Sequence, residues 1–349
     1  MTDSFDQQMP GSAVSGPAMP DGPSPSVRVP ALPTGPSMKD LDPLTVRPRT
    51  SSRVLCLVSG LALLALSALV WWLAVFTIRG QEYDDEVWNN FKGFTINVPW
   101  IHAFLGFFTS HVNTTVICVL IALVALVVVL LRRRWWLLGQ MVVYAAMSYA
   151  AGRALKILLP RPFLVNVMSS GKNSAPSGHT IMAVTVFLVL LCVVPRVWRG
   201  LTALLGVPFT LAVGCSVIQG KWHRPSDVVM GILIAGGLAL ITLAFTRGSG
   251  MDATGTRMSS ASVQIVSTVL LTAGLLGVVY GAFVIWQMDS GLQMGARWTF
   301  YGAHCSAVIL IASTAGLVAG LVLALRQVTA SPLTRLGLVG EPPAPPRAG

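Results

Sequence analysis

The sequence predicts an all-α, polytopic membrane protein with about eight transmembrane helices. Apolar residues make up 54% of the 349 residues, whereas charged residues make up only 11%. Soluble domains carry roughly 25% charged residues, so this balance is typical of a chain embedded in lipid. Runs of about 20 apolar residues recur, and each can cross a hydrocarbon core of roughly 30 Å. The alternative, a soluble all-helical protein, is disfavoured by the number and length of these runs.

The expected spans follow one another in chain order, near residues 54–78, 112–131, 135–158, 178–195, 201–220, 227–246, 263–287 and 303–325. The first six form a six-helix membrane domain over 51–246. The last two follow a loop at 247–262 and carry no polar cluster, so we expect them to be additions to that domain. The segments 1–50 and 326–349 show no periodic apolar pattern, and we expect them to be disordered tails.

Two segments between the first and second spans are expected outside the hydrocarbon core. The stretch 98–111 is amphipathic and interrupted by polar residues, so it should lie in the outer interface or lead into the second span. The acidic stretch "EYDDE" at 82–86 is expected in an outer loop.

Basic residues indicate the orientation of the chain. Cations cluster before the first span, after the second and in later alternate loops, at Arg53, Arg132, Arg133, Arg134, Arg196, Arg199, Arg247 and Arg257. Because such loops face the cytoplasm, both termini are expected inside, and 159–177, 221–226 and 288–302 outside.

The same cations explain the net charge of +11, and no nucleic-acid motif is present. The five cysteines lie in or beside apolar runs, with neither a disulfide framework nor metal-ligand spacing.

Three polar clusters interrupt the apolar pattern, and the predicted topology puts all three on the outer face. "LLPRPF", with Arg161 and Pro162, ends the third span. "NSAPSGHT" (173–180) opens the fourth span, and "GKWHRPSD" (220–227) lies between the fifth and sixth. Because the spans were assigned from apolarity alone, the shared face is an independent observation.

The second cluster has the composition of a helix start. Ser174 is a candidate N-cap and Pro176 suits the first turn. Free backbone N–H groups and the helix dipole make such a start an anion site. Ser177 adds a hydroxyl, and Gly178 lets a ligand approach the backbone. An ordinary capped helix would explain serine and proline, but would leave His179 without a role.

In the third cluster, His223 and Asp227 are four residues apart, so they share a face if the helix extends back to the histidine. Asp227 would then accept the imidazole N–H and fix its tautomer. The alternative is an interfacial histidine, with Asp227 as a favourable charge at a helix N-terminus.

Taken together, two histidines, an aspartate, an arginine and two helix N-termini suggest phosphoryl transfer. One histidine would attack phosphorus and the other would protonate the leaving oxygen. This chemistry requires neither a metal nor a cofactor, and few metal ligands converge on the outer face. The remaining histidines stand apart from the clusters and are expected to be interfacial or packing residues: His102, His111 and His304.

The motifs "PRP", "PSGH" and "H-x-x-x-D", in this order over roughly residues 54–246, resemble the type 2 phosphatidic acid phosphatase (PAP2) superfamily. The resemblance implies that His223 is a nucleophile that forms a phosphohistidine, oriented by Asp227, with His179 as general acid. It further implies phosphate contacts from Arg161, Ser177 and Gly178. The family cleaves phosphate or pyrophosphate from lipids, usually without metal. The implied partners are therefore a phosphorylated lipid and the bilayer, with the site on the outer face of the plasma membrane.

Two phosphate-binding cations of the family are missing in register. The lysine seven residues before the arginine is Ala154 here, and the arginine six residues before the histidine is Val217. Losing one transition-state donor costs on the order of 10²–10³ in rate. Nearby cations are candidate substitutes: Lys221, Arg224, Lys172 and Arg153. Lys156 is the poorer candidate, because it lies about 200° around an ideal helix from Ala154.

Two functions therefore stay open. The first is a lipid phosphatase or pyrophosphatase. The second is a catalytically impaired relative that binds anionic headgroups, or acts as a partner or transport component. A channel or secondary transporter is disfavoured, because acidic residues within the spans are nearly absent. The sequence does not indicate an oligomeric state.

Overall fold

The computed structural model describes Pro48 and residues 50–165, 173–252, 261–293 and 296–330, and over these ranges it contains helices and no strands. The α-helices are α2 (Thr50–Phe76), α3 (Ile78–Thr95), α4 (Pro99–Phe108), α5 (His111–Leu131), α6 (Trp135–Leu158), α7 (Gly178–Val193), α8 (Arg196–Gln219), α9 (Pro225–Leu243), α10 (Ala261–Gln293) and α11 (Arg297–Ala330). A short 3-10 helix, η2 (Gly248–Gly250), follows α9. The predicted all-α membrane fold is confirmed. Most of the predicted tails lies outside the described residues.

Each of the eight expected spans corresponds to a helix. Within the described ranges, six helices are long and apolar enough to cross a membrane: α2, α5, α8, α9, α10 and α11. The fourth expected span, α7, has 16 residues, which is short for a crossing. The third, α6, has 24 residues, but its apolar sequence is interrupted by Gln140, Arg153 and Lys156.

The centre of the helix packing is α9, whose residues are almost all buried. It packs against α2, α6, α7 and α11. The contact with α2 depends on two glycines, because a Cβ atom at Gly60 would lie 2.8 Å from the carbonyl oxygen of Gly237. Small residues at such points let membrane helices approach closely.

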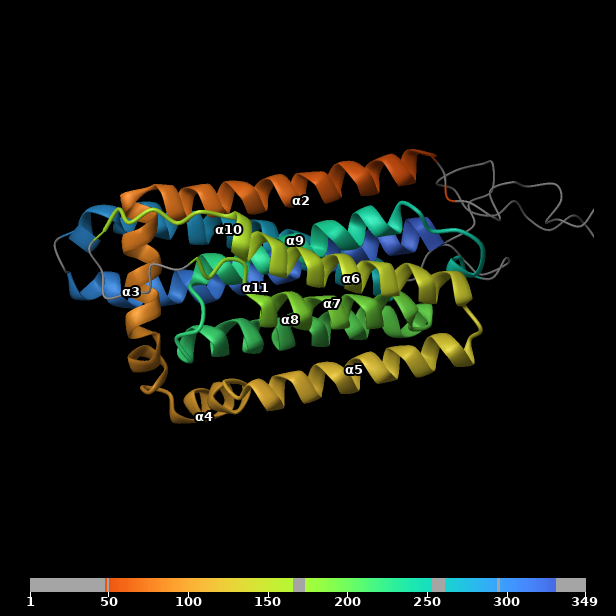
Figure 1. Ribbon diagram of the computed structural model, residues 1–349, viewed down its shortest axis with the longest axis horizontal. Coiled ribbons are helices and arrows are strands. Elements are labelled where there is room, and N and C mark those ends of the chain that lie inside the picture. Colours follow the sequence, from red (N-terminus) through yellow and green to blue (C-terminus); the bar gives the residue numbers. More distant parts are fainter. Residues whose placement is uncertain (1–47, 49, 166–172, 253–260, 294–295, 331–349) are drawn as a thin grey trace, which may run out of the picture. The chain divides into compact units, whose positions relative to one another are not determined.

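The acidic stretch 82–86 is not in a loop: it lies within α3, which crosses the other helices near one end (Figure 1). Its first turn is capped by Thr77, whose hydroxyl accepts from the amide of Gly80 at 3.0 Å. Tyr83, Val87 and Phe91 are buried and recur every four residues, which is the spacing of one helical face. The acidic residues lowered the apparent apolarity of the segment, and the sequence prediction missed this face.

The last helix is built into the same core as the others. α10 and α11 pack along each other, and α11 also packs against α8 and α9. Near one end of α11, Ser306 and the Tyr83 hydroxyl lie 3.0 Å apart. Near the other end, the buried Arg326 donates to the carbonyl oxygens of Cys192 and Gly250 at 3.2 and 2.9 Å. α11 therefore takes part in the helix packing, and it continues to Ala330, five residues into the segment predicted to be a tail.

Candidate functional site

One face of α3 connects the first and third polar clusters. Four polar or aromatic residues share this face because they follow the i, i+3, i+4, i+7 pattern of a helix: Gln81, Asp84, Asp85 and Trp88. Gln81 donates to the carbonyl oxygen of Pro162 at 2.8 Å and accepts from the amide of Leu164 at 3.4 Å. The segment that carries Arg161 is thereby fixed against α3.

The same face holds the start of α9. Asp84 accepts from the amide of Ser226 at 3.2 Å and also from its hydroxyl. Asp85 accepts from Nε of Arg224 at 3.0 Å. Burial, and then the charge of Asp227, raise the pKa of Asp84 to about 7, although Ser226 and Arg224 oppose this rise.

His223 and Asp227 form the hydrogen-bonded pair that their spacing suggests. Nδ1 of His223 lies 3.3 Å from Oδ2 of Asp227, and the histidine is only 6% exposed. The same carboxylate oxygen accepts from the Ser174 hydroxyl at 2.6 Å and from the amide of Arg224 at 3.0 Å. With Nδ1 engaged, Nε2 has no hydrogen bond among the described residues and is the nitrogen left for chemistry.

The start of α7 is capped by Ser177, not by Ser174 as the sequence suggested. The hydroxyl oxygen of Ser177 accepts from the amide of Thr180 at 3.4 Å and from its hydroxyl at 2.9 Å. The amide of Ser177 donates to the carbonyl oxygen of Asp227 at 3.0 Å. Ser174 instead binds Asp227, so the second and third clusters form one hydrogen-bonded unit. α7 begins at Gly178 with its first N–H groups unpaired within the helix.

His111 does not stand apart, contrary to the sequence prediction. Its Nδ1 lies 3.0 Å from Nε2 of His179. Its ring stacks on Trp222, with centroids 3.7 Å apart and planes at 1°. Because Trp222 immediately precedes His223, His111 links the two histidines that the motifs single out. The other two histidines do pack elsewhere, His102 beside Thr95 and His304 against Phe94.

Arg161 presents an unsatisfied cation. Both of its terminal nitrogens are shielded from solvent and have no hydrogen-bond partner among the described residues. Burial, and then the charge of Arg224, lower its pKa from the ordinary value, whereas Asp84 and Asp227 oppose this. A buried guanidinium without a partner is rare in folded proteins and matches the two-pronged geometry of a phosphate group.

Lys156 reaches the start of α7, although the sequence placed it last among the substitute cations. Its Nζ lies 3.9 Å from the position that a Cβ atom on Gly178 would occupy. It is also within electrostatic reach of His179 and Asp227. The angle around an ideal helix describes only the direction of the Cβ atom. The lysine side chain beyond it is long and flexible enough to bend back toward Gly178.

The other substitutes are less suited to hold a phosphate. Arg224 is paired with Asp85 and also donates from Nη1 to Ser174 at 3.2 Å, so among the described residues its Nη2 is left without a partner. Lys221 lies over the ring of Trp88, 5.3 Å from its centroid. Arg153 is exposed, and Lys172 lies outside the described residues. Val217, where the family has an arginine, is fully buried.

Comparison with known proteins agrees with this geometry. Residues 137–250 match the family model described as the PAP2 superfamily. Neither the curated proteins nor the solved structures contain a match. The matched segment includes all three polar clusters, from Arg161 to Asp227. In the part of the chain that the structure describes, His, Cys, Asp and Glu side chains form no group of three or more that could hold a metal. Over this third of its length the membrane-spanning chain is similar to the PAP2 superfamily, with substitutions in the first and third motifs.

Proposed function

We propose that this protein hydrolyses a phosphomonoester or pyrophosphate of a membrane lipid through a phosphohistidine intermediate. The match of residues 137–250 to the PAP2 superfamily and the six long apolar helices of the described ranges support the broader statement, a membrane phosphatase-like protein. The single observation that carries the specific proposal is Arg161: its terminal nitrogens are buried and have no partner among the described residues, and its charge interacts with that of Asp227. An anionic phosphate group would satisfy them.

The reaction follows from the nitrogen atoms left available. Nε2 of His223 attacks phosphorus, an N–P bond forms, and the P–O bond to the lipid breaks. His179 transfers a proton to the departing oxygen. A water molecule then attacks the phosphohistidine and gives its proton to His179, and the N–P bond breaks to release phosphate. Asp227, bonded to Nδ1, stabilises the positive charge on His223 during attack.

The phosphate oxygens would be held by groups from two helices and one loop. Arg161 supplies two donors, and Lys156 supplies a cation near Gly178. The amides of Gly178 and His179 add donors at the N-terminus of α7. The Ser177 oxygen caps the helix as an acceptor, which leaves its hydroxyl proton for the substrate. Lys156 thus takes the place of the lysine that the family has seven residues before the arginine.

We place this site on the outer face of the plasma membrane, with both chain termini in the cytoplasm. This orientation rests on the arginines at the opposite end of the helices, above all Arg132, Arg133 and Arg134. The lipid would then approach from the outer leaflet.

The test is phosphate release by the protein purified in detergent, with phosphatidic acid, phosphatidylglycerophosphate and polyprenyl pyrophosphate as substrates. We expect release from at least one lipid, its loss in His223→Ala, and its retention in His102→Ala. An acid-labile, base-stable phosphate on wild-type protein, absent from His223→Ala, identifies the intermediate. No release from any lipid, or equal release by His223→Ala, contradicts the proposal.

A second function has one observation in its favour. The buried Val217 stands where the family has an arginine, so one donor to the transition state is absent at this position. The protein would then bind an anionic headgroup without cleaving it. Retention of phosphatidic acid through purification, with no phosphate release over hours, would support this function.

A further inference from the structure

A pocket of about 410 Å³ lies at the far end of α9 from His223. It is lined by Pro48, Arg53, Trp136, Ala244, Phe245, Thr246 and Arg247. α9 has 19 residues, so the pocket is about 28 Å from the proposed reaction site. Its volume is in the range of small-ligand sites, roughly 300–1,000 Å³. None of the residues proposed to take part in the reaction lines this pocket, so it is a separate site.

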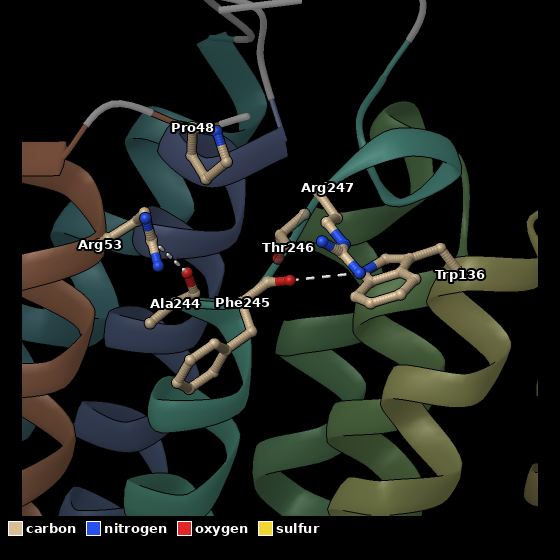
Figure 2. Close-up of a pocket in the computed structure, with 7 residues that line it drawn as sticks. All are labelled: Pro48, Arg53, Trp136, Ala244, Phe245, Thr246 and Arg247. Atoms are coloured by element: carbon tan, nitrogen blue, oxygen red, sulfur yellow. Dashed lines mark hydrogen bonds between the residues drawn. The ribbon is translucent and has the colours of Figure 1, made fainter. Parts of the chain in front are cut away.

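Two guanidinium groups face this pocket from different elements, as Figure 2 shows. Nε of Arg53, on α2, donates to the carbonyl oxygen of Ala244 at 3.0 Å. Arg247 lies over the ring of Trp136, 3.9 Å from its centroid. Trp136 is in turn fixed by a bond from its Nε1 to the carbonyl oxygen of Phe245 at 3.3 Å. Both arginines are therefore positioned before any ligand arrives.

The other N–H donors of Arg53 and Arg247 are available to a ligand. The terminal nitrogens of Arg53 and the Arg247 side chain make no hydrogen bond or ion pair among the described residues. Two fixed guanidinium groups beside one cavity, with no counter-charge in the described part of the chain, are suited to an anion with several oxygens. Phosphate fits this geometry better than a single carboxylate.

The residues around the pocket indicate that this phosphate belongs to a lipid headgroup. Apolar side chains next to the arginines are exposed, including Val54 at 51%, Phe245 at 54% and Trp135 at 64%. On a membrane protein such side chains face acyl chains and the interface. In the sequence, further arginines neighbour the lining residues, at positions 47, 49, 132 and 134. Basic clusters flanking a span attract anionic lipids.

We propose that this pocket binds the phosphate of an anionic phospholipid headgroup, with Arg53 and Arg247 as its ligands and Trp136 as the platform that orients Arg247. The acyl chains extend along the exposed apolar residues of α2 and the end of α9. The site is a lipid-binding site in the leaflet opposite to the reaction, and it performs no chemistry.

The test is titration of the purified full chain in detergent with short-chain phosphatidylglycerol, followed by microscale thermophoresis. This phosphodiester carries no terminal phosphate, so it is not a substrate of the proposed reaction. We expect Kd to rise at least about tenfold in Arg53→Gln and in Arg247→Gln. The matched control is Arg133→Gln, which removes an equal charge from an exposed residue at the same end and should change Kd less than about twofold.

Any of the following results overturns the proposal. Unchanged Kd in both pocket variants, or an equal loss in Arg133→Gln, means that binding is non-specific. Loss of binding in Arg161→Gln alone means that the lipid occupies the other site. Inorganic phosphate binding as tightly as the lipid means that the ligand is free phosphate. Because Arg53→Gln also removes a contact to Ala244, Arg247→Gln decides the result if the first variant fails to fold.

Discussion

Arg224 and Asp85 form a buried ion pair between the start of α9 and α3, with Nε and Oδ1 3.0 Å apart. Their side chains are only 3% and 5% exposed. The pair neutralises the arginine nearest to His223 in sequence, so Arg224 holds the site together more than it attracts substrate. The phosphate charge must then be met by other cations, and Arg161 and Lys156 are placed to do so.

Breaking this pair should destabilise the protein. Asp85→Asn leaves a buried, uncompensated guanidinium, which costs about 3–5 kcal/mol of unfolding free energy. Thermal unfolding in detergent measures the effect. Glu86→Gln is the control, because Glu86 lies next in sequence and bonds only Asn90 among the described residues. A melting temperature for Asp85→Asn equal to that of the control would show that the pair is not needed for stability.

Lys156 should matter for catalysis more than Arg153, although both lie on the last turns of α6. Lys156→Met removes the cation nearest to Gly178, and we expect phosphate release to fall by about 10²–10³. Arg153→Met removes an exposed cation and should stay within about twofold of wild type. Steady-state phosphate release from the preferred lipid measures both. If the two substitutions lower phosphate release equally, Lys156 attracts the headgroup and has no further role in catalysis.

His111 should act as a positioning residue for His179. His111→Phe keeps a ring for stacking on Trp222 but removes the bond to His179. We expect kcat to fall roughly fivefold to tenfold, the equivalent of one hydrogen bond of about 1 kcal/mol. The pH profile of kcat should shift as well, because the environment of the general acid changes. His111→Asn, which can still form a hydrogen bond, should recover part of the rate. A change in KM alone, with an unaltered pH profile, would argue against positioning.

Asp84 should make stability depend on pH. Its pKa is raised to about 7 from the ordinary value of 3.8, so between these values the folded protein holds a proton that the unfolded chain has released. The contribution of Asp84 to unfolding free energy therefore falls as pH rises from about 4 to about 7 and is constant above that. The melting temperature of Asp84→Asn, relative to wild type, should increase over this interval. Glu82→Gln, on the same helix, is the control for removing a carboxylate from α3. If the melting temperature of Asp84→Asn relative to wild type does not change with pH, the expectation is contradicted.

Much of the fold was predictable because apolar runs report directly on lipid-facing helices. The runs beginning near Val54, Val112 and Val263 each correspond to a long helix. The pairing of His223 with Asp227 was equally accessible, since a four-residue spacing at a helix start fixes a shared face. Ser174 and Ser177 show the limit of this approach, because the sequence allows either serine to cap α7. Ser177 is the cap because Ser174 binds Asp227, which lies more than fifty residues away in the chain.

The missed features all depend on contacts between distant segments. His111 reaches His179 across 68 positions, and no local pattern at the start of α5 reports this. Lys156 was misjudged because ideal helix geometry places a Cβ atom and not the end of a flexible chain. The helix α3 did carry a signal, the i, i+3, i+4, i+7 pattern from Gln81 to Trp88, which was hidden by the acidic composition of the segment.

The residues of α3 that hold the site lie more than forty positions before the segment that matches the superfamily, which begins at residue 137. Gln81, Asp84 and Asp85 would therefore be absent from a fragment cut at the motif boundaries, and Arg224 would lose its buried counter-charge. A fragment that keeps the site intact must therefore include α3 as well as the matched segment. Grafting the three motifs into another helical scaffold would transfer the reactive side chains without the helix that holds them in register.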